Sequence, residues 1–290
     1  MAIPAPSTNA SIPVAVVQMN SRGDKAANLA TALALIDRAA GTGARLICLP
    51  ETWTFLGGDE GARANAEPIP GPVTDQLAAK ARQHGVYLHA GSVHERVAGD
   101  PRVRNTTVVI APDGEIVARY SKIHMFDVAL DGGESYRESS VVAPGDEIVT
   151  FDMDGVTVGL AICYDLRFPE LFRILALRGA EIVILPAAFT MKTGKDHWEV
   201  LIRARAIENQ VYMVAPGQHG TYDDAHWCFG RSTIVDPWGV VLATAPDADT
   251  VITATLDMGR LAAVRRQVHS LANRMPDRYA WPDPATVRTR

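Results

Sequence analysis

The sequence predicts an α/β protein, folded as a four-layer α-β-β-α sandwich built from two related halves. Three observations support this fold: β-branched runs alternate with Ala- and Leu-rich helical stretches, several runs are apolar throughout, and parts of the chain repeat. A strand that is apolar on both faces needs cover on both faces, from helices or from a second sheet. Two facing sheets with helices outside them meet that requirement.

The expected strands and helices alternate along the chain, so that each half runs strand, helix, strand, helix, strand, strand. β-branched and apolar runs predict strands over Val14–Gln18, Leu46–Leu49, Tyr87–Ser92, Asn105–Ala111, Thr157–Ile162, Ile182–Leu185, Val211–Ala215 and Ser232–Asp236. Apolar residues at helical spacing predict helices over Asn28–Ala40, Gly71–His84, Pro169–Arg178 and His197–Asn209.

The repeats are short but keep the same order in both halves. The segment from Gly43 to Pro50 is echoed by the segment from Gly179 to Pro186. Val86-Tyr87 matches Val211-Tyr212, and the run Val108–Gly114 matches Thr233–Gly239 at the same separation along the chain. A shared separation favours duplication over the chance similarity of Ala- and Val-rich sequences. The C-terminal ends of such strands are where a functional site is expected.

The chain is expected to form one domain. No stretch rich in Pro, Gly or Ser divides its 290 residues, so we expect a single domain over residues 12–280. Residues 1–11 are small and polar and are expected to form a flexible leader, and residues 281–290 a C-terminal tail.

Charge and cysteine usage narrow the classes of partner. The net charge is −5 with scattered Lys and Arg, which argues against nucleic acid and membrane surfaces as partners. No apolar run approaches the ~18 residues of a membrane span. The three cysteines are an odd count without CxxC spacing, which argues against disulfides and a zinc site and favours a reducing compartment. We therefore expect a cytoplasmic protein, and the absence of HxH and HExxH patterns predicts no metal.

Cys163 is the candidate nucleophile. An apolar strand runs directly into it, a short polar turn follows, and a helix then opens with Pro169 at its first position. Such a junction exposes the residue at its apex and aims backbone N–H groups at it. The nearby helix N-terminus is expected to favour thiolate and so lower the cysteine pKa. Cys48 lies inside an apolar strand and is interpreted as a core residue, and Cys228 as a loop thiol.

Glu51 and Lys122 are the candidate partners of the nucleophile, because the eight histidines offer no clear base. Glu51 directly follows the apolar strand 46–49, where a carboxylate can be partly desolvated and act as a base. Its counterpart in the second half is Ala187, so the carboxylate is not needed for the fold alone. Lys122 lies in an aromatic and apolar setting, where an ammonium can stabilise an oxyanion.

Three motifs together resemble the carbon–nitrogen hydrolases of the nitrilase superfamily. They are Pro50-Glu51, Tyr120-Ser-Lys122-Ile-His, and Cys163-Tyr-Asp-Leu-Arg-Phe-Pro-Glu, and the resemblance extends from Val14 to about Tyr279. Further matches resemble the Nit branch, which contains omega-amidase and deaminated glutathione amidase. These matches are Phe126-Asp127, Gly145-Asp146, Thr193-Gly194, His197-Trp198-Glu199, Arg203–Ile207 and Asp236-Pro-Trp-Gly239.

The resemblance implies a cysteine amidase that acts on a small primary amide of a carboxylate-bearing molecule. Glu51 is then the base, Lys122 and the backbone N–H of Tyr164 hold the oxyanion, and a thioester forms on Cys163. In the family a second glutamate joins the site, and Glu138 lies at the matching position. A loop carboxylate without a role in the site is nearly as good an interpretation of Glu138. No metal or organic cofactor is needed, and the resemblance implies two-fold pairing into a homodimer or a larger homo-oligomer.

Alternatives remain at this point. The same three residues could serve a nitrilase or an N-carbamoyl amine amidohydrolase. A binding protein with a vestigial site and a redox-sensing thiol are alternatives of other classes. An arginine or lysine should pair the substrate carboxylate, and Arg167 is interpreted as a structural partner of Asp165 or Glu170.

Overall fold

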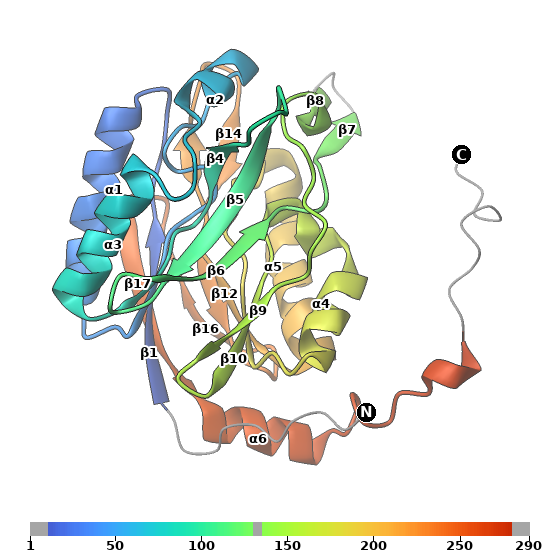
Figure 1. Cartoon of the computed structure of the whole chain (residues 1–290). Coiled ribbons are helices and arrows are strands. Elements are labelled where there is room, and N and C mark those ends of the chain that lie inside the picture. Colours follow the sequence, from blue (N-terminus) through green and yellow to red (C-terminus); the bar gives the residue numbers. More distant parts are fainter. Residues whose placement is uncertain (1–10, 130–134, 280–290) are drawn as a thin grey trace.

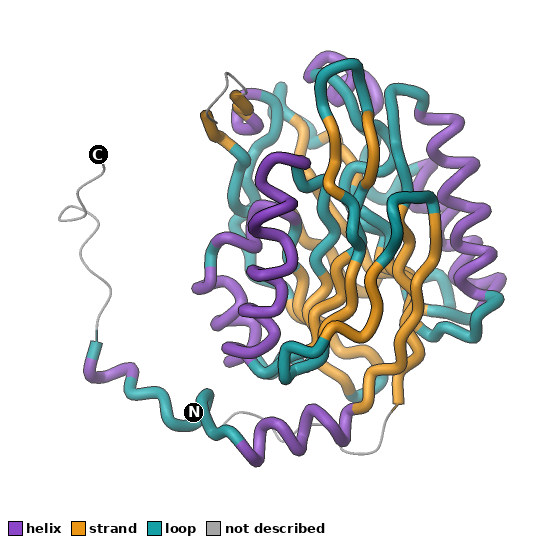
Figure 2. The backbone as a smooth tube through the Cα atoms, turned by 180° about the vertical axis from the view of Figure 1, so that it is seen from behind, coloured by secondary structure: helices purple, strands orange, loops and turns teal. Residues whose placement is uncertain are grey.

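The computed structural model describes residues 11–129 and 135–279, and these form two sheets that face each other between helices. The predicted leader and tail fall on residues 1–10 and 281–290, which lie outside the described residues, whereas Ser11 already belongs to the first strand. In Figure 1, α1 and α3 cover one outer face and α4 and α5 cover the opposite one. Figure 2 shows the same layers from behind, with the strands between the two groups of helices.

The first sheet and its helices come mainly from the first half of the chain. The sheet has the order β17-β1-β2-β3-β5-β4, with β6 also paired to β5. Its strands are β1 (Ser11–Gln18), β2 (Leu46–Cys48), β3 (Tyr87–His89), β4 (Val93–Arg96), β5 (Val103–Ile110), β6 (Ile116–Ser121) and β17 (Thr250–Asp257). The helices of this half are α1 (Lys25–Ala40), α2 (Asp59–Asn65) and α3 (Pro72–His84).

The second sheet comes from the second half and has the order β16-β15-β12-β11-β10-β9. Its strands are β9 (Thr150–Met153), β10 (Val156–Leu160), β11 (Ile182–Ile184), β12 (Tyr212–Ala215), β15 (Thr233–Val235) and β16 (Val241–Thr244). The helices are α4 (Pro169–Leu177), α5 (Met191–Asn209) and α6 (Met258–Gln267). Two small ribbons and three 3-10 helices complete the described chain: β7 (Asp127–Ala129) with β8 (Ser135–Arg137), β13 (His219–Thr221) with β14 (Trp227–Phe229), η1 (Glu138–Ser140), η2 (Cys163–Arg167) and η3 (Pro276–Arg278).

The two halves share one topology, as the repeats predict. In the first half Leu46 pairs in parallel with Val14 and Tyr87, and in the second Ile182 pairs in parallel with Val158 and Tyr212. In each half the third parallel strand then pairs with an antiparallel one, β3 with β5 and β12 with β15. The predicted duplication, with Tyr87 and Tyr212 at matching positions, is therefore confirmed.

The sheets are buried on both faces. Along β2, Leu46 and Cys48 belong to the core between the two sheets, and Ile47 belongs to the core under the helices. Because side chains alternate along a strand, an all-apolar strand supplies both cores at once. Cys48 is fully buried, as its core interpretation predicts.

Three predictions on the elements are wrong in detail. The strand predicted over residues 87–92 ends at His89, and Gly91, with φ +62°, carries the chain past Pro50, whose carbonyl oxygen a Cβ at Gly91 would approach to 2.0 Å. Helix α5 begins at Met191 and not at His197. Cys228 is not a loop thiol, because it is buried in β14. Several further elements were not predicted: α2, α6, β4, β6, β9, β16, β17 and the two ribbons.

Candidate active site

Glu51 lies just beyond β2, at the edge where parallel strands end, and only 4% of it is exposed. Its Oε1 accepts hydrogen bonds from Asn105 Nδ2 at 2.8 Å and Lys122 Nζ at 3.3 Å. Its Oε2 accepts one from the backbone N–H of Ala188 at 2.6 Å. A buried carboxylate requires such partners, and here they fix the orientation of the side chain.

Lys122 follows the last residue of β6 and is 2% exposed, so it is not a solvated surface lysine. Its ammonium contacts Glu138 Oε1 at 2.9 Å and Oε2 at 2.8 Å, in addition to Glu51. Burial alone would lower the pKa of Lys122, but the charges of Glu138 and Glu51 outweigh it and raise the pKa well above its ordinary value. The site therefore contains a fixed positive charge.

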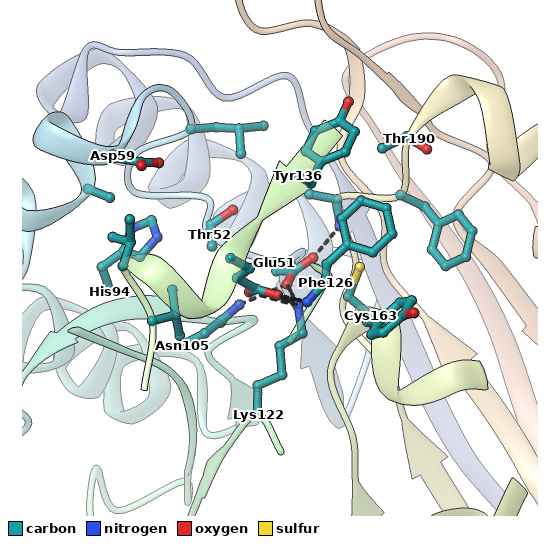
Figure 3. Close-up of a pocket in the computed structure, with 18 of the residues that line it drawn as sticks. Glu51, Thr52, Asp59, His94, Asn105, Lys122, Phe126, Tyr136, Cys163 and Thr190 are labelled. Carbon is teal, nitrogen blue, oxygen red and sulfur yellow. Dashed lines mark hydrogen bonds and ion pairs between the residues drawn. The ribbon is translucent and has the colours of Figure 1, made fainter. Parts of the chain in front are cut away.

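Glu138 lies at the start of η1 and reaches the site from the strand pair β7–β8. Beside its two contacts with Lys122, its Oε2 accepts a hydrogen bond from the Phe126 backbone N–H at 2.6 Å. Lys122 thus lies between two carboxylates, as the dashed lines in Figure 3 show. The arrangement makes Glu138 a direct partner of the ammonium.

Cys163 opens η2 at the end of β10, with φ +47°, and its backbone N–H donates to the carbonyl of Pro186 at 2.9 Å. A positive φ at a non-glycine residue is uncommon and marks a turn whose backbone is held by its surroundings. The side chain lines the same pocket as Glu51 and Lys122. The predicted turn is therefore present, but its apex is not exposed, because only 8% of Cys163 is accessible. The first helix after the strand is a short 3-10 helix, and α4 begins only at Pro169.

The predicted lowering of the Cys163 pKa is wrong. Burial and the negative charge of Glu51 raise the pKa well above its ordinary value, against the opposing charge of Lys122. The resting cysteine is accordingly a neutral thiol, and its nucleophilicity depends on a base that removes the proton.

Asp165 joins the nucleophile turn to the strand that carries the lysine. This fully buried carboxylate accepts hydrogen bonds from Tyr120 OH at 2.6 Å, His124 Nδ1 at 2.8 Å and the Ile162 backbone N–H at 2.8 Å. Tyr120 and His124 flank Lys122 in sequence, and Ile162 precedes Cys163. Asp165 therefore links the segments that carry Cys163 and Lys122.

The expected pairing of Arg167 with Asp165 or Glu170 is also wrong. The Arg167 guanidinium lies over the rings of Tyr164 at 5.8 Å and Phe189 at 5.3 Å, and contacts His197 at 3.3 Å. A different arginine stabilises the turn that contains Cys163. Arg205 of α5 donates two hydrogen bonds to the carbonyl of Leu166, at 2.8 and 3.0 Å. Arg167 is thus placed beside pocket-lining rings.

Tyr164 occupies the second position of η2, and the first amides of a helix have no partner within the helix. Its ring lines the pocket and meets Phe126 and Phe168 edge-on, with centroids 5.0 and 5.5 Å apart. The predicted backbone donor therefore lies directly beside the nucleophile.

One pocket brings together all five residues that the sequence analysis singled out: Glu51, Lys122, Glu138, Cys163 and Tyr164. Asn105, Asp165, Thr52 and His94 were not predicted as site residues from the sequence. Asn105 and His94 carried a weak signal as polar residues within predicted buried strands or next to them, but the partner of Asn105, Glu51, lies 54 residues away in sequence. Within residues 11–129 and 135–279, no three His, Cys, Asp or Glu side chains are grouped so that they could hold a metal ion. In the same residues no helix is long and apolar enough to cross a bilayer.

Comparison with known proteins identifies the class that this fold and pocket define. The sequence model of the carbon-nitrogen hydrolase family matches residues 13–266, and the chain belongs to this family. The crystal structure of Saccharomyces cerevisiae Nit3, a member of the nitrilase superfamily, has a TM-score of 0.82 at 31% identity, covering 92% of this chain and 97% of Nit3.

Two curated relatives are closer in sequence. The chain is 38% identical to the omega-amidase NIT2 of Mus musculus over 266 residues, 92% of this chain and 96% of that protein. It is 42% identical to the deaminated glutathione amidase of Synechocystis over 265 residues, 90% of this chain and 97% of that protein. The predicted resemblance to the nitrilase superfamily and its Nit branch is confirmed, and the chain is a carbon–nitrogen hydrolase.

Proposed function

We propose that this enzyme hydrolyses the terminal primary amide of a small, carboxylate-bearing molecule through a thioester on Cys163. The observation that carries the proposal is the convergence of a buried thiol, a carboxylate and a fixed ammonium in one pocket, at the ends of strands from both halves. The names of the relatives, omega-amidase and deaminated glutathione amidase, support the substrate class.

In the first step Glu51 takes the proton of the Cys163 thiol, and the sulfur attacks the amide carbonyl carbon. The raised pKa of Cys163 supports this role for a base, because little thiolate exists before substrate binds. The carbonyl electron pair moves to oxygen, and Lys122 Nζ with the Tyr164 backbone N–H stabilises the resulting oxyanion.

In the second step the tetrahedral intermediate collapses. Glu51 donates its proton to the leaving nitrogen, the C–N bond breaks, and ammonia departs from the thioester. Water then attacks the thioester carbonyl as Glu51 accepts its proton, the C–S bond breaks, and the acid and the free thiol are restored. We assign Glu138 to holding Lys122, since both of its oxygens contact that ammonium, and to positioning the water.

We assign the substrate carboxylate to Arg167. Its guanidinium is held over two pocket-lining rings, and a pre-positioned guanidinium can bind a carboxylate through two parallel hydrogen bonds. Arg137 lines the pocket itself, whereas Arg167 lies behind the two rings, but Arg137 is exposed and so is less restrained. Arg167→Gln should raise KM for carboxylate-bearing amides by roughly 10-fold or more, which corresponds to the ~1.5 kcal/mol or more of a charged hydrogen bond. KM for an uncharged amide such as propionamide should change little. Equal losses for both substrates would contradict the assignment.

The reaction type is tested by a panel of omega-amides, the corresponding nitriles and N-carbamoyl amines, with ammonia release as the readout. We expect the omega-amides of dicarboxylic acids to have the highest kcat/KM. A preference for nitriles or carbamoyl compounds would overturn the amide assignment while leaving the cysteine chemistry in place.

We further propose that the enzyme is cytoplasmic.

We also propose that two copies pair through an exposed apolar patch. The patch consists of Val200 and Ile207 of α5 with Trp238 and Val240 of the β15–β16 turn. These four side chains are between 48% and 66% exposed. A Cβ at Gly239 would meet Ile207 Cδ1 at 2.6 Å, so α5 and the turn adjoin at this point. Contiguous apolar surface supports a protein interface. Light scattering should give the dimer mass, and Val200→Glu with Ile207→Glu should give the monomer; a monomeric wild-type enzyme would contradict the proposal.

A further inference from the structure

Gln218 is a buried glutamine of the second half whose side chain reaches the turn that carries Glu51. It lies shortly after β12, and only 1% of it is exposed. Its Nε2 donates hydrogen bonds to the carbonyl oxygen of Glu51 at 3.0 Å and to Ser21 Oγ at 2.9 Å. Its Oε1 accepts one from the Ser21 backbone N–H at 3.0 Å. The side-chain amide therefore uses both of its N–H groups and its oxygen.

The backbone of Gln218 contacts the matching turn of the second half. Its N–H donates to the carbonyl of Ala187 at 2.8 Å. The next residue, Ala188, donates its own N–H to the carboxylate of Glu51 at 2.6 Å. One buried residue thus contacts the main chain of Glu51 and the segment that orients the Glu51 side chain.

The backbone after Glu51 needs this support. Thr52 has φ +47°, in the left-handed region, and a non-glycine residue keeps such a conformation only where its surroundings determine it. A second buried side chain also contacts the turn: Ser92 Oγ accepts from the Thr52 backbone N–H at 3.0 Å. Gln218 and Ser92 therefore bind the C=O and the N–H of one peptide group, the one that joins Glu51 to Thr52. Because these two groups point in opposite directions in a trans peptide, the pair fixes its orientation.

We propose that Gln218, together with Ser92, is a positioning residue for the base: by fixing the peptide group after Glu51 it aligns the carboxylate with the Cys163 thiol. This inference rests on the proposed function, in which Glu51 takes the thiol proton. Neither Gln218 nor Ser92 lines the pocket, so we assign their effect on the reaction to Glu51. A misaligned carboxylate slows proton transfer, while the substrate contacts remain.

The experiment is a double-mutant cycle on the rate at which an omega-amide acylates Cys163. Gln218→Met keeps the length of the side chain but removes both hydrogen bonds that it donates. At saturating amide we expect acylation about tenfold slower than in the wild type, with the half-saturating concentration within about twofold. In the Glu51→Gln background the same replacement should change the remaining rate by less than about twofold, since no base is left to misalign.

Ser92→Ala tests the same peptide group in case Gln218→Met fails to fold. It removes the acceptor of the Thr52 N–H and should slow acylation about threefold, again only where Glu51 is present.

Gln18→Met is the matched control. Gln18 is also a fully buried glutamine, but its side chain accepts from the Ser232 N–H at 2.9 Å and donates to the carbonyl of Ala248 at 3.0 Å, not to the Glu51 turn. Its acylation rate should stay within about twofold of the wild-type rate. An equal loss in Gln18→Met and Gln218→Met would indicate a general effect of buried glutamines and overturn the proposal.

Slowing by the same factor in both backgrounds would also overturn it, because Gln218 would then act on the fold and not on Glu51. Unchanged acylation in Gln218→Met and Ser92→Ala, or an effect confined to the half-saturating concentration, would have the same consequence. Failure of the proposed function is seen without these variants, as equal acylation of the wild type and Glu51→Gln or as no acylation by any omega-amide. In the latter case the cycle is run with the nitrile or carbamoyl compound that acylates Cys163.

Discussion

The turn after β2 and the turn after β11 occupy matching places in the two halves, but the first contributes a side chain to the site and the second contributes backbone groups. The first ends in Pro50-Glu51 and the second in Pro186-Ala187, each at the end of a parallel strand. In the first turn the carboxylate points into the pocket. In the second, the backbone N–H of the next residue, Ala188, donates to that same carboxylate, and the Pro186 carbonyl accepts from Cys163. A duplicated turn can thus supply a reactive group in one copy and the backbone that orients it in the other.

The largest expected effect comes from removing the nucleophile that lies between the two turns. Cys163→Ala should lower amide hydrolysis by roughly 10⁴-fold or more, since the covalent route is lost. The fold should remain intact, because one small turn residue replaces another. Turnover and circular dichroism measure the two quantities.

Cys48→Ala is the control for this variant, since Cys48 is fully buried in the core between the sheets. It should keep activity and cost about 1 kcal/mol in the free energy of unfolding. Near-normal turnover of Cys163→Ala, or loss of turnover in Cys48→Ala, would refute the assignment of the nucleophile.

Making the two turns alike should damage the protein. Ala187 is fully buried, so Ala187→Glu would place a second carboxylate close to Glu51 without a partner of its own. We expect a loss of about 3 kcal/mol or more in the free energy of unfolding, measured by chemical denaturation. Ala187→Gln has a similar size without the charge and should lose less. Equal stability of the Glu and wild-type proteins would show that the turns are interchangeable.

Asp165→Asn should produce a smaller loss. The carboxylate accepts from three groups that position Cys163 and Lys122, and the amide nitrogen of Asn cannot accept a hydrogen bond. We expect kcat to fall about tenfold or more with KM nearly unchanged, because the reacting groups are displaced while the substrate contacts remain. An effect confined to KM would contradict a positioning role.

The smallest effect to be measured is the difference in reactivity among the three cysteines. Iodoacetamide should label Cys163 first, because its side chain lines the pocket and is 8% exposed, whereas Cys48 and Cys228 are 0% and 2% exposed. Since the pKa of Cys163 is itself raised, its labelling rate should keep rising with pH beyond neutrality. Peptide mass spectrometry follows each site. A plateau near pH 7 would mean a stable thiolate and would contradict the neutral resting thiol.

The fold and the grouping of Glu51, Lys122 and Cys163 could be predicted because their signals are local. Glu51 and Cys163 each follow an apolar strand within a few residues, Lys122 lies in an aromatic and apolar segment, and the repeats predict the order of the strands. The start of α5 could not be predicted, because Gly194 interrupts the helical pattern. The glycine is required by tertiary packing, since a Cβ at residue 194 would meet Phe229 at 2.4 Å.

The errors at the site have the same origin. Asn105 and Ala188 donate hydrogen bonds to Glu51 and lie 54 and 137 residues from it in sequence. No local sequence pattern therefore predicts these contacts. The pKa of Cys163 depends on burial and on Glu51, neither of which is visible in the strand–turn–helix motif. Two of the partners of Asp165, Tyr120 and His124, likewise come from a segment more than 40 residues away.

The central claim, that Glu51 is the base for attack by Cys163, is tested most directly by trapping the acyl-enzyme. Rapid quenching and mass spectrometry of the intact protein measure the rate at which Cys163 gains the acyl group of an omega-amide. Glu51→Gln should slow this acylation by about 10²-fold or more, since no group then takes the thiol proton. Glu138→Gln should slow it less, because Lys122 keeps its contact with Glu51 and the reacting groups remain in place. If Glu138→Gln blocks acylation as completely as Glu51→Gln does, the single-base account is wrong and the two carboxylates act as one coupled pair.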